Sequence, residues 1–324
     1  MSALVACLFA TYPGASATPA YGPVGTVLKA QSLPTRLWVP GTRAAWKLTY
    51  VSTDEHGKKT PVTGEVMIPK GTPPRGGWPV ITWAHGTSGL ADKCAPSTMG
   101  PAEPARDFSY LKTWMSQGYA IVATDYAGLG TPGVPAYLGG MSEAHNIVDM
   151  VKAGRTFANT GPAWRHLATR FVIIGQSQGG GAAIYTARYA SQFAGKGLSY
   201  RGAVGTGTPA NIEKTLLIVG PKIPPVKVLP AGIASYMGYI FASLRHVYPQ
   251  LGIDKILTPE GKKYLALAEQ QCVMQYENTV GATNLGDWFT QPVITLPNFA
   301  NTVNAYMAMP TSGFDKPFFM ANGL

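Results

Sequence analysis

The chain has 324 residues, of which 46% are hydrophobic and 13% are charged. This balance is typical of a folded protein with a sizeable core and excludes a disordered chain. The formal net charge is +10, but the basic residues are scattered rather than gathered into runs. We therefore expect no nucleic-acid partner, and the charge favours solubility and attraction to anionic interfaces.

The first residues have features of an export signal. Residues 3–10 are apolar, and Ala15-Ser16-Ala17 is a tripeptide of the kind that signal peptidases cleave, although no basic residue precedes Lys29. We expect residues 1–17 to be a signal peptide and the protein to be secreted, either extracellular or periplasmic. No later apolar run is long enough for a transmembrane span.

The chain has three cysteines. Cys7 would leave with the signal peptide, so Cys94 and Cys272 would remain as a pair. In an oxidising compartment a disulfide between them is favoured, and two unpaired buried thiols are the alternative.

Strands and helices are expected to alternate from Ala45 onward. Residues 46–51 and 61–68 flank the polar segment 54–59 and predict an antiparallel hairpin, and residues 78–84 predict a buried strand. Further along we expect a helix over 108–117, a strand over 119–125, a helix with Ser142 as its N-cap and Gly154 closing it, and strands over 171–174 and 202–207. The alternation implies a single α/β domain with a mostly parallel sheet.

The segment Gly175-Gln-Ser-Gln-Gly179 lies between a short apolar strand and a run of small residues that favours helix. A strand, a sharp turn and a helix with serine at the turn are the context in which G-x-S-x-G forms a nucleophile elbow. Ser177 is therefore the predicted nucleophile, and a plain surface turn is the alternative. The backbone N–H of Gln178 and one from the Thr87 region are expected to form an oxyanion hole.

Residues 209–310 are predicted to be a helical insertion after the strand over 202–207. A long, mostly apolar helix is expected over 231–248, and a second helix is expected to begin with Thr258 as N-cap and Pro259, running to Tyr276. We expect this insertion to be a lid over Ser177, with apolar residues of 231–244 meeting an acyl chain. An ordinary packed helical subdomain is the alternative.

With these elements in place, the chain resembles the secretory lipase family of α/β-hydrolases, of the lipase A type. The likeness rests on Trp83-Ala-His-Gly-Thr87, Asp125-Tyr-Ala-Gly-Leu-Gly130, Gly175-Gln-Ser-Gln-Gly179 and the helical insertion. It implies an α/β-hydrolase domain over 18–324, an acyl pocket under a lid, ester hydrolysis without metal or cofactor, and a disulfide between Cys94 and Cys272.

In this fold the catalytic residues occur in the order serine, acid, histidine. Residues 316–321 look like the strand that precedes the acid, and no aspartate after Ser177 has a histidine after it. We expect the acid, the base and the final strands to lie beyond Leu324, as in a truncated sequence. Glu213 and His246 satisfy the order by themselves and are the alternative pair.

The predicted function is a secreted serine ester hydrolase, a triacylglycerol lipase or carboxylesterase that acts on lipid or ester substrates, at a lipid–water interface where the substrate forms one. The alternative is a catalytically inert or truncated α/β-hydrolase-like protein that binds lipid. The sequence does not predict an oligomeric state.

Overall fold

The computed structural model describes residues 21–221 and 228–322. The signal peptide predicted over 1–17 therefore lies outside the described residues. The strands are β1 (Val27–Ser32), β2 (Thr42–Thr53), β3 (Lys59–Pro69), β4 (Trp78–Ala84), β5 (Ala120–Thr124), β6 (Leu167–Gln176), β7 (Ser199–Thr206) and β8 (Phe318–Ala321). The helices are α1 (Pro96–Met99), α2 (Pro104–Ser116), α3 (Gly140–Asn159), α4 (Gln178–Ala194), α5 (Ile212–Leu216), α6 (Ala231–Val247), α7 (Pro259–Ala268), α8 (Val273–Val280) and α9 (Phe299–Met307).

The described strands form one sheet in the order β1-β2-β3-β5-β4-β6-β7-β8. The first three strands and β5 pair antiparallel, and every pair from β5 to β8 is parallel. The predicted hairpin is confirmed, with Val51 opposite Pro61. The mostly parallel α/β sheet is also as predicted. Because parallel strands end at the same edge, the loops after β4, β5 and β6 meet there.

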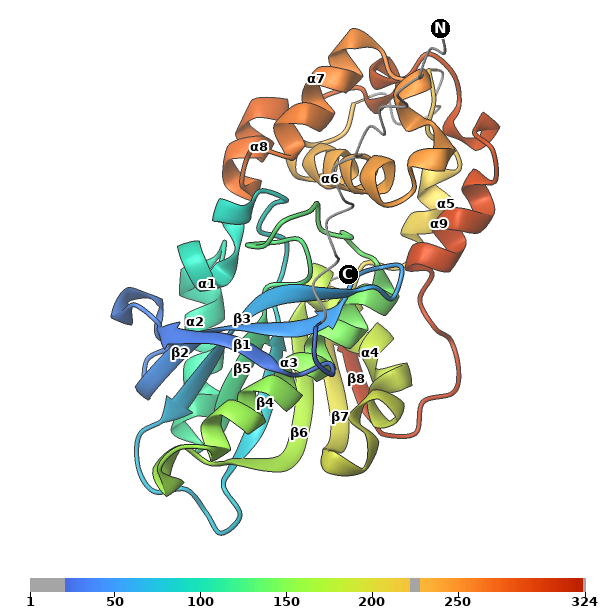
Figure 1. The fold of residues 1–324 in the computed structure, drawn as a ribbon. Helices are drawn as coiled ribbons and strands as arrows, with labels where there is room; N and C mark the ends of the chain where they lie inside the picture. The colour runs from blue at the N-terminus through green and yellow to red at the C-terminus, as the bar shows by residue number, and fades with distance from the viewer. Residues whose placement is uncertain (1–20, 222–227, 323–324) are drawn as a thin grey trace, which may run out of the picture.

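Helices cover both faces of the sheet (Figure 1). On one face, α3 and α4 pack against the central strands through an apolar cluster that includes Ile147, Ala183 and Ile173. On the other face, Leu111 and Met115 of α2 pack against Ile81 and Ile121. These two clusters hold the central strands, and so the loops at their ends, in fixed positions.

Helix α3 differs from the prediction at both ends. It begins at Gly140 with Gly139 as N-cap, so Ser142 is a buried residue of the first turn and does not cap the helix. It also continues past Gly154, which does not terminate it, and ends at Asn159. A Cβ added to Gly154 would lie 3.0 Å from a side-chain carbon of Val122 and 3.1 Å from one of Val66. The small residue therefore allows the helix to pack closely on the sheet.

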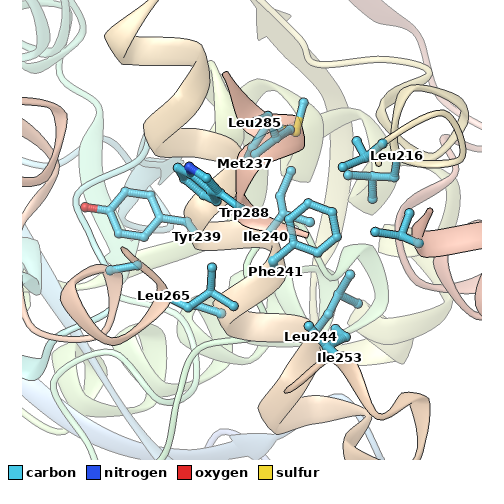
Figure 2. Close-up of a cluster of buried hydrophobic side chains, with 14 of the residues drawn as sticks. Leu216, Met237, Tyr239, Ile240, Phe241, Leu244, Ile253, Leu265, Leu285 and Trp288 are labelled. Carbon is cyan, nitrogen blue, oxygen red and sulfur yellow. The ribbon is translucent and has the colours of Figure 1, made fainter. Parts of the chain in front are cut away.

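Helices α5 to α9 lie together beyond one end of the sheet (Figure 1). They share an apolar core of their own, in which α6 is central, and Figure 2 shows its side chains converging with those of neighbouring elements. The helix expected over 258–276 is two helices, α7 and α8, separated near Cys272. Thr258 is the N-cap as predicted, and its side chain accepts a hydrogen bond from the N–H of Gly261. We call α5–α9 the helical unit below.

A disulfide joins Cys94 to Cys272 and connects the loop after β4 to the first residues of α8. Hydrogen bonding reinforces this connection, since the N–H of Val273 donates to the carbonyl of Ser88 at 2.9 Å. The alternative of two unpaired thiols is excluded. The helical unit is thus covalently fixed to the edge of the sheet at which the predicted nucleophile lies.

The turn between β6 and α4 depends on two glycines. A Cβ on Gly175 would overlap the carbonyl oxygen of Gly179, and a Cβ on Gly179 would overlap the carbonyl group of Ala84. The backbones of β4, β6 and α4 therefore approach more closely than any side chain would allow. This close approach explains sterically why both of these positions in the G-x-S-x-G segment are glycine.

Replacing both Cys94 and Cys272 by serine is expected to lower the free energy of unfolding. The cross-link spans 178 residues, and closing a loop of that length contributes about 5 kcal/mol in the chain-entropy model, as an upper value. Urea denaturation followed by tryptophan fluorescence measures the loss. Reductant should lower the stability of the wild type and leave the double variant unchanged. Equal stabilities of the two proteins without reductant would contradict the expectation.

Replacing Gly179 by alanine is expected to destabilise the fold by about 3 kcal/mol, at the upper end of the usual cost of overpacking, because the added Cβ would overlap backbone atoms of Ala84 and His85. Gly197→Ala is the matched control, since nothing lies within 4 Å of a Cβ at that position. Thermal unfolding of both variants tests the claim. A Gly179→Ala protein as stable as Gly197→Ala would refute it.

Candidate active site

Ser177 lies at the tip of the turn between β6 and α4. Its φ is 56° and its ψ is −123°, a conformation that non-glycine residues rarely adopt. Two backbone hydrogen bonds hold it there: its N–H donates to the carbonyl of Thr206 at 2.8 Å, and its carbonyl accepts from the N–H of Gly181 at 3.1 Å. The structure thus has the strained strand–turn–helix geometry of a nucleophile elbow at the predicted serine.

A cleft with a volume of about 120 Å³ opens at Ser177. One wall is the loop after β4, with His85, Gly86 and Thr87, and the opposite wall comes from α6 and α8 of the helical unit. A Cβ on Gly86 would be only 3.7 Å from the Cβ of Ser177, so this loop contacts the serine directly. Ser177 and Thr87 therefore lie in the same cleft.

Gln178 is the first residue of α4, and the first N–H groups of a helix have no acceptor within the helix. These N–H groups lie at the positive end of the helix dipole. The side chain of Gln178 is buried and is directed toward α3, where its Nε2 donates to Oε1 of Glu143 at 2.7 Å. The side chain of Gln178 is thus bonded away from the cleft, and the predicted donor is its backbone N–H at the start of α4.

Thr87 is held by a hydrogen bond between its Oγ1 and the hydroxyl of Tyr137 at 2.7 Å. Tyr137 is in turn fixed through its backbone, since its N–H donates to Ser243 Oγ at 2.9 Å and its carbonyl accepts from the hydroxyl of Tyr306 at 2.7 Å. Ser243 belongs to α6 and Tyr306 to α9. The helical unit therefore helps to fix the loop that carries Thr87.

Within the described residues, His85 is the only histidine that lines the cleft. Its Nδ1 lies 2.7 Å from the carbonyl oxygen of Gly86, its Nε2 lies 3.3 Å from that of Asp125, and its ring packs on Tyr126 at 4.5 Å. Both ring nitrogens thus face backbone carbonyls. Through these contacts His85 connects the loops after β4 and β5.

The alternative pair Glu213 and His246 is not formed. His246 Nε2 lies 2.8 Å from Oε1 of Glu269, whereas Glu213 is a buried residue of α5. Neither residue lines the cleft at Ser177. Order along the chain does not bring these two side chains together, because the partner of His246 is Glu269.

The cleft is more polar than the sequence predicts. Its charged lining residues are Glu103, Arg106, Asp107 and Glu277. Arg106 Nε lies 2.8 Å from Oδ1 of the buried Asp107, which neutralises that pair. Burial, with a smaller effect from Glu277, raises the pKa of the nearby Tyr236, so this hydroxyl is neutral at pH 7.

The expectation that the apolar residues of 231–244 meet an acyl chain is wrong for this cleft. Among the described residues of α6, Tyr236 alone lines it. Ile240, Phe241 and Leu244 are buried in the core of the helical unit (Figure 2). An isolated apolar helix face does not reveal whether protein or substrate covers it, and here protein covers it.

Sequence reasoning missed Glu143 and Tyr137, which support the two predicted oxyanion residues. A signal for Glu143 was available. It lies four residues before Ile147 and eight before Val151, on the face that the periodicity predicts to be buried. A carboxyl group on an apolar helix face indicates a specific buried partner.

The described residues contain neither a membrane-spanning helix nor a cluster of metal ligands. None of their helices combines the length and apolar character needed to cross a bilayer. In the same residues, no group of three or more histidine, cysteine or acidic side chains is placed to hold a metal ion.

Solved structures share this fold. A closed form of lipase A from Candida antarctica is similar with a TM-score of 0.74 and 20% identity, covering 93% of this chain and 70% of that one. A rice cell wall degrading esterase, LipA from Xanthomonas oryzae, gives a TM-score of 0.72 at 20% identity, covering 94% and 83%. A putative hydrolase from Legionella pneumophila gives 0.70 at 19% identity, covering 91% and 83%. At such identities the likeness shows the fold.

A comparison with curated proteins finds no match. A model of the secretory lipase family matches residues 102–295, which is more than half of the chain. This region includes the elbow, α3 and most of the helical unit. Together with the nucleophile elbow and the shared α/β-hydrolase fold, the match shows that the chain belongs to the secretory lipase family.

Proposed function

We propose that this protein is a serine hydrolase of carboxylic esters, a lipase or carboxylesterase in which Ser177 is the nucleophile. The observation that carries the proposal is the backbone of Ser177, held at a positive φ between β6 and α4 and exposed to the cleft. A protein pays a strain cost for such a conformation, and this cost is typical of functional positions. Membership of the secretory lipase family supports an ester substrate.

In the proposed mechanism, Ser177 Oγ attacks the ester carbonyl carbon and gives its proton to a general base. The tetrahedral intermediate collapses to an acyl-enzyme, and the alcohol leaves with the proton from the base. Water then gives a proton to the base and attacks the acyl carbon, the ester bond to Ser177 breaks, the carboxylic acid leaves, and Ser177 regains its proton from the base. The backbone N–H groups of Gln178 and Thr87 would stabilise the oxyanion, each worth about 3 kcal/mol of barrier. His85 does not fit the role of base, because its ring faces backbone carbonyls.

The helical unit is proposed to cover the substrate. Tyr236 of α6 and Val273, Met274 and Glu277 of α8 line the cleft opposite the loop after β4. The disulfide at Cys272 holds the start of α8 over this loop. The helices therefore supply the wall through which a substrate is recognised, which is the position of a lid.

The charge of the cleft supports a preference among esters. Arg106 is paired with Asp107, and within the described residues no ion pair involves Glu103 or Glu277. The rim thus carries excess negative charge on a chain whose net charge is positive. We propose that neutral esters are favoured over esters that carry a carboxylate near the reacting carbonyl.

We propose that the protein is secreted. The family is described as secretory, and the disulfide is typical of an oxidising compartment.

Ser177→Ala is expected to abolish hydrolysis of p-nitrophenyl butyrate, with a loss of at least about 10³-fold in kcat, because the nucleophile is removed. A fluorophosphonate probe should label the wild type at Ser177, as mapped by mass spectrometry of the labelled peptide. Ser191→Ala, on the same helix, is the matched control and should retain both activity and labelling. A folded wild type that neither turns over nor reacts with the probe would refute the proposal in favour of an inert, binding role.

Replacing both Glu103 and Glu277 by glutamine is expected to improve the relative use of an anionic ester. The ratio of kcat/KM for p-nitrophenyl hemisuccinate to that for p-nitrophenyl butyrate should rise about two- to fivefold at low ionic strength, because two rim charges are removed. High salt should shrink the difference through screening. The exposed Glu260→Gln, outside the cleft, is the control. An unchanged ratio would show that the rim charges do not select the substrate.

A further inference from the structure

A buried carboxyl group lies behind the elbow, in a position that the proposed chemistry does not use directly. Glu143 is in the first turn of α3, and its side chain is 2% exposed. Removing a carboxyl group from water is costly unless it forms hydrogen bonds, so its partners indicate what it does.

Glu143 has two kinds of partner. Its Oε1 accepts a hydrogen bond from Nε2 of Gln178 at 2.7 Å, and the side chain of Gln178 is itself 6% exposed. The carboxyl group also lies next to the backbone of Leu138, whose N–H opposes the rise in the pKa of Glu143, and the two residues line the same small cavity. Leu138 has a φ of 61°, so the chain is held in a strained conformation as it enters α3.

These partners connect Glu143 to each of the two segments that would supply the oxyanion donors. Gln178 is the residue whose backbone N–H would be one donor. Leu138 directly follows Tyr137, whose hydroxyl is 2.7 Å from Oγ1 of Thr87, in the loop that would supply the other donor. One carboxyl group is therefore connected to the first turn of α4 and to the loop after β4.

We propose that Glu143 is a positioning residue that fixes the two oxyanion donors relative to each other through Gln178 and through the segment Tyr137–Leu138. This inference rests on the proposed function of Ser177. Glu143 touches no reacting atom in this role. It acts by removing the freedom of the two backbone segments, so that the donors need no rearrangement when the oxyanion forms.

The protonation state of Glu143 suits this role. Burial raises its pKa to about 8, with the hydrogen bond from Gln178 and the N–H of Leu138 opposing and Glu55 adding to the effect. The other titratable groups that face it are Tyr126, Tyr137 and Tyr306, and burial raises the pKa of each well above its ordinary value. At neutral pH the carboxyl group is therefore neutral and places no negative charge behind a developing oxyanion.

The test compares Glu143→Ala and Glu143→Gln with Asp149→Asn, using p-nitrophenyl butyrate and the full chain. Asp149 is buried on the same helix and accepts a hydrogen bond from Ser52 Oγ at 2.8 Å, away from the elbow. Glu143→Ala should lower kcat by about 10- to 100-fold with KM within about twofold. Glu143→Gln should recover most of kcat, because its amide oxygen still accepts from Gln178. Asp149→Asn should lower stability alone.

The pH dependence separates positioning from stability. Wild-type kcat should fall as pH rises through about 8, because ionised Glu143 puts a buried negative charge behind the oxyanion. Glu143→Gln should lack this loss, whereas Glu55→Gln should retain it. Because the folded-state pKa is raised, wild-type stability relative to Glu143→Gln should decline between pH 4.5 and about 8.

Each possible result of these experiments either supports or overturns the proposed positioning role of Glu143. An active wild type together with a folded Glu143→Ala protein of unchanged kcat overturns it and leaves the proposed function intact. If Glu143→Ala does not fold, the Glu143→Gln profile decides, and the same alkaline loss as in wild type overturns the inference. A wild type without esterase activity or probe labelling refutes the proposed function, and the inference with it.

Discussion

The close contact between the first turn of α4 and the end of β4 is the constraint on which the site depends. Gly179 lies against the carbonyl group of Ala84, where no Cβ fits, and Gly175 lies equally close to α4. Ser177, between these two glycines, has a positive φ. The apolar clusters on both faces of the sheet supply the free energy that maintains this strain. The reactive position is thus a consequence of packing elsewhere in the sheet.

The loop after β4 is held from three directions. The Cys94–Cys272 disulfide joins it to α8, Tyr137 joins Thr87 to α6 and α9, and His85 joins it to the loop after β5. Loops at functional sites are often the least stable parts of a protein. Here covalent and hydrogen-bonded connections restrict the loop, so one candidate oxyanion donor has a defined position before any substrate arrives. The helical unit contributes both a wall of the cleft and part of this support.

A buried polar pair, Glu143 and Gln178, lies beside the elbow; other buried polar groups, such as Glu65 and Asp149, lie elsewhere in the core. Glu143 and Gln178 form a hydrogen bond in a region where apolar packing would be less costly. Such a pair gives directional control that apolar contacts do not, because a hydrogen bond fixes both distance and angle. Burial raises the pKa of Glu143 to about 8, which favours the neutral carboxyl group and so lowers the cost of burying it.

The sequence alone determined the main alternation of strands and helices, the mostly parallel α/β class, the sharp strand–turn–helix at Ser177 and the pairing of Cys94 with Cys272 as the favoured state. Those features depend on local residue pattern: apolar periodicity, glycine spacing and cysteine number. Only the tertiary structure decided the ends of α3, the break between α7 and α8, the packing of the apolar α6 residues in a core, and the hydrogen bonds of Glu143 and Tyr137. Each depends on contacts between residues distant in the chain, and no local pattern specifies which groups will meet.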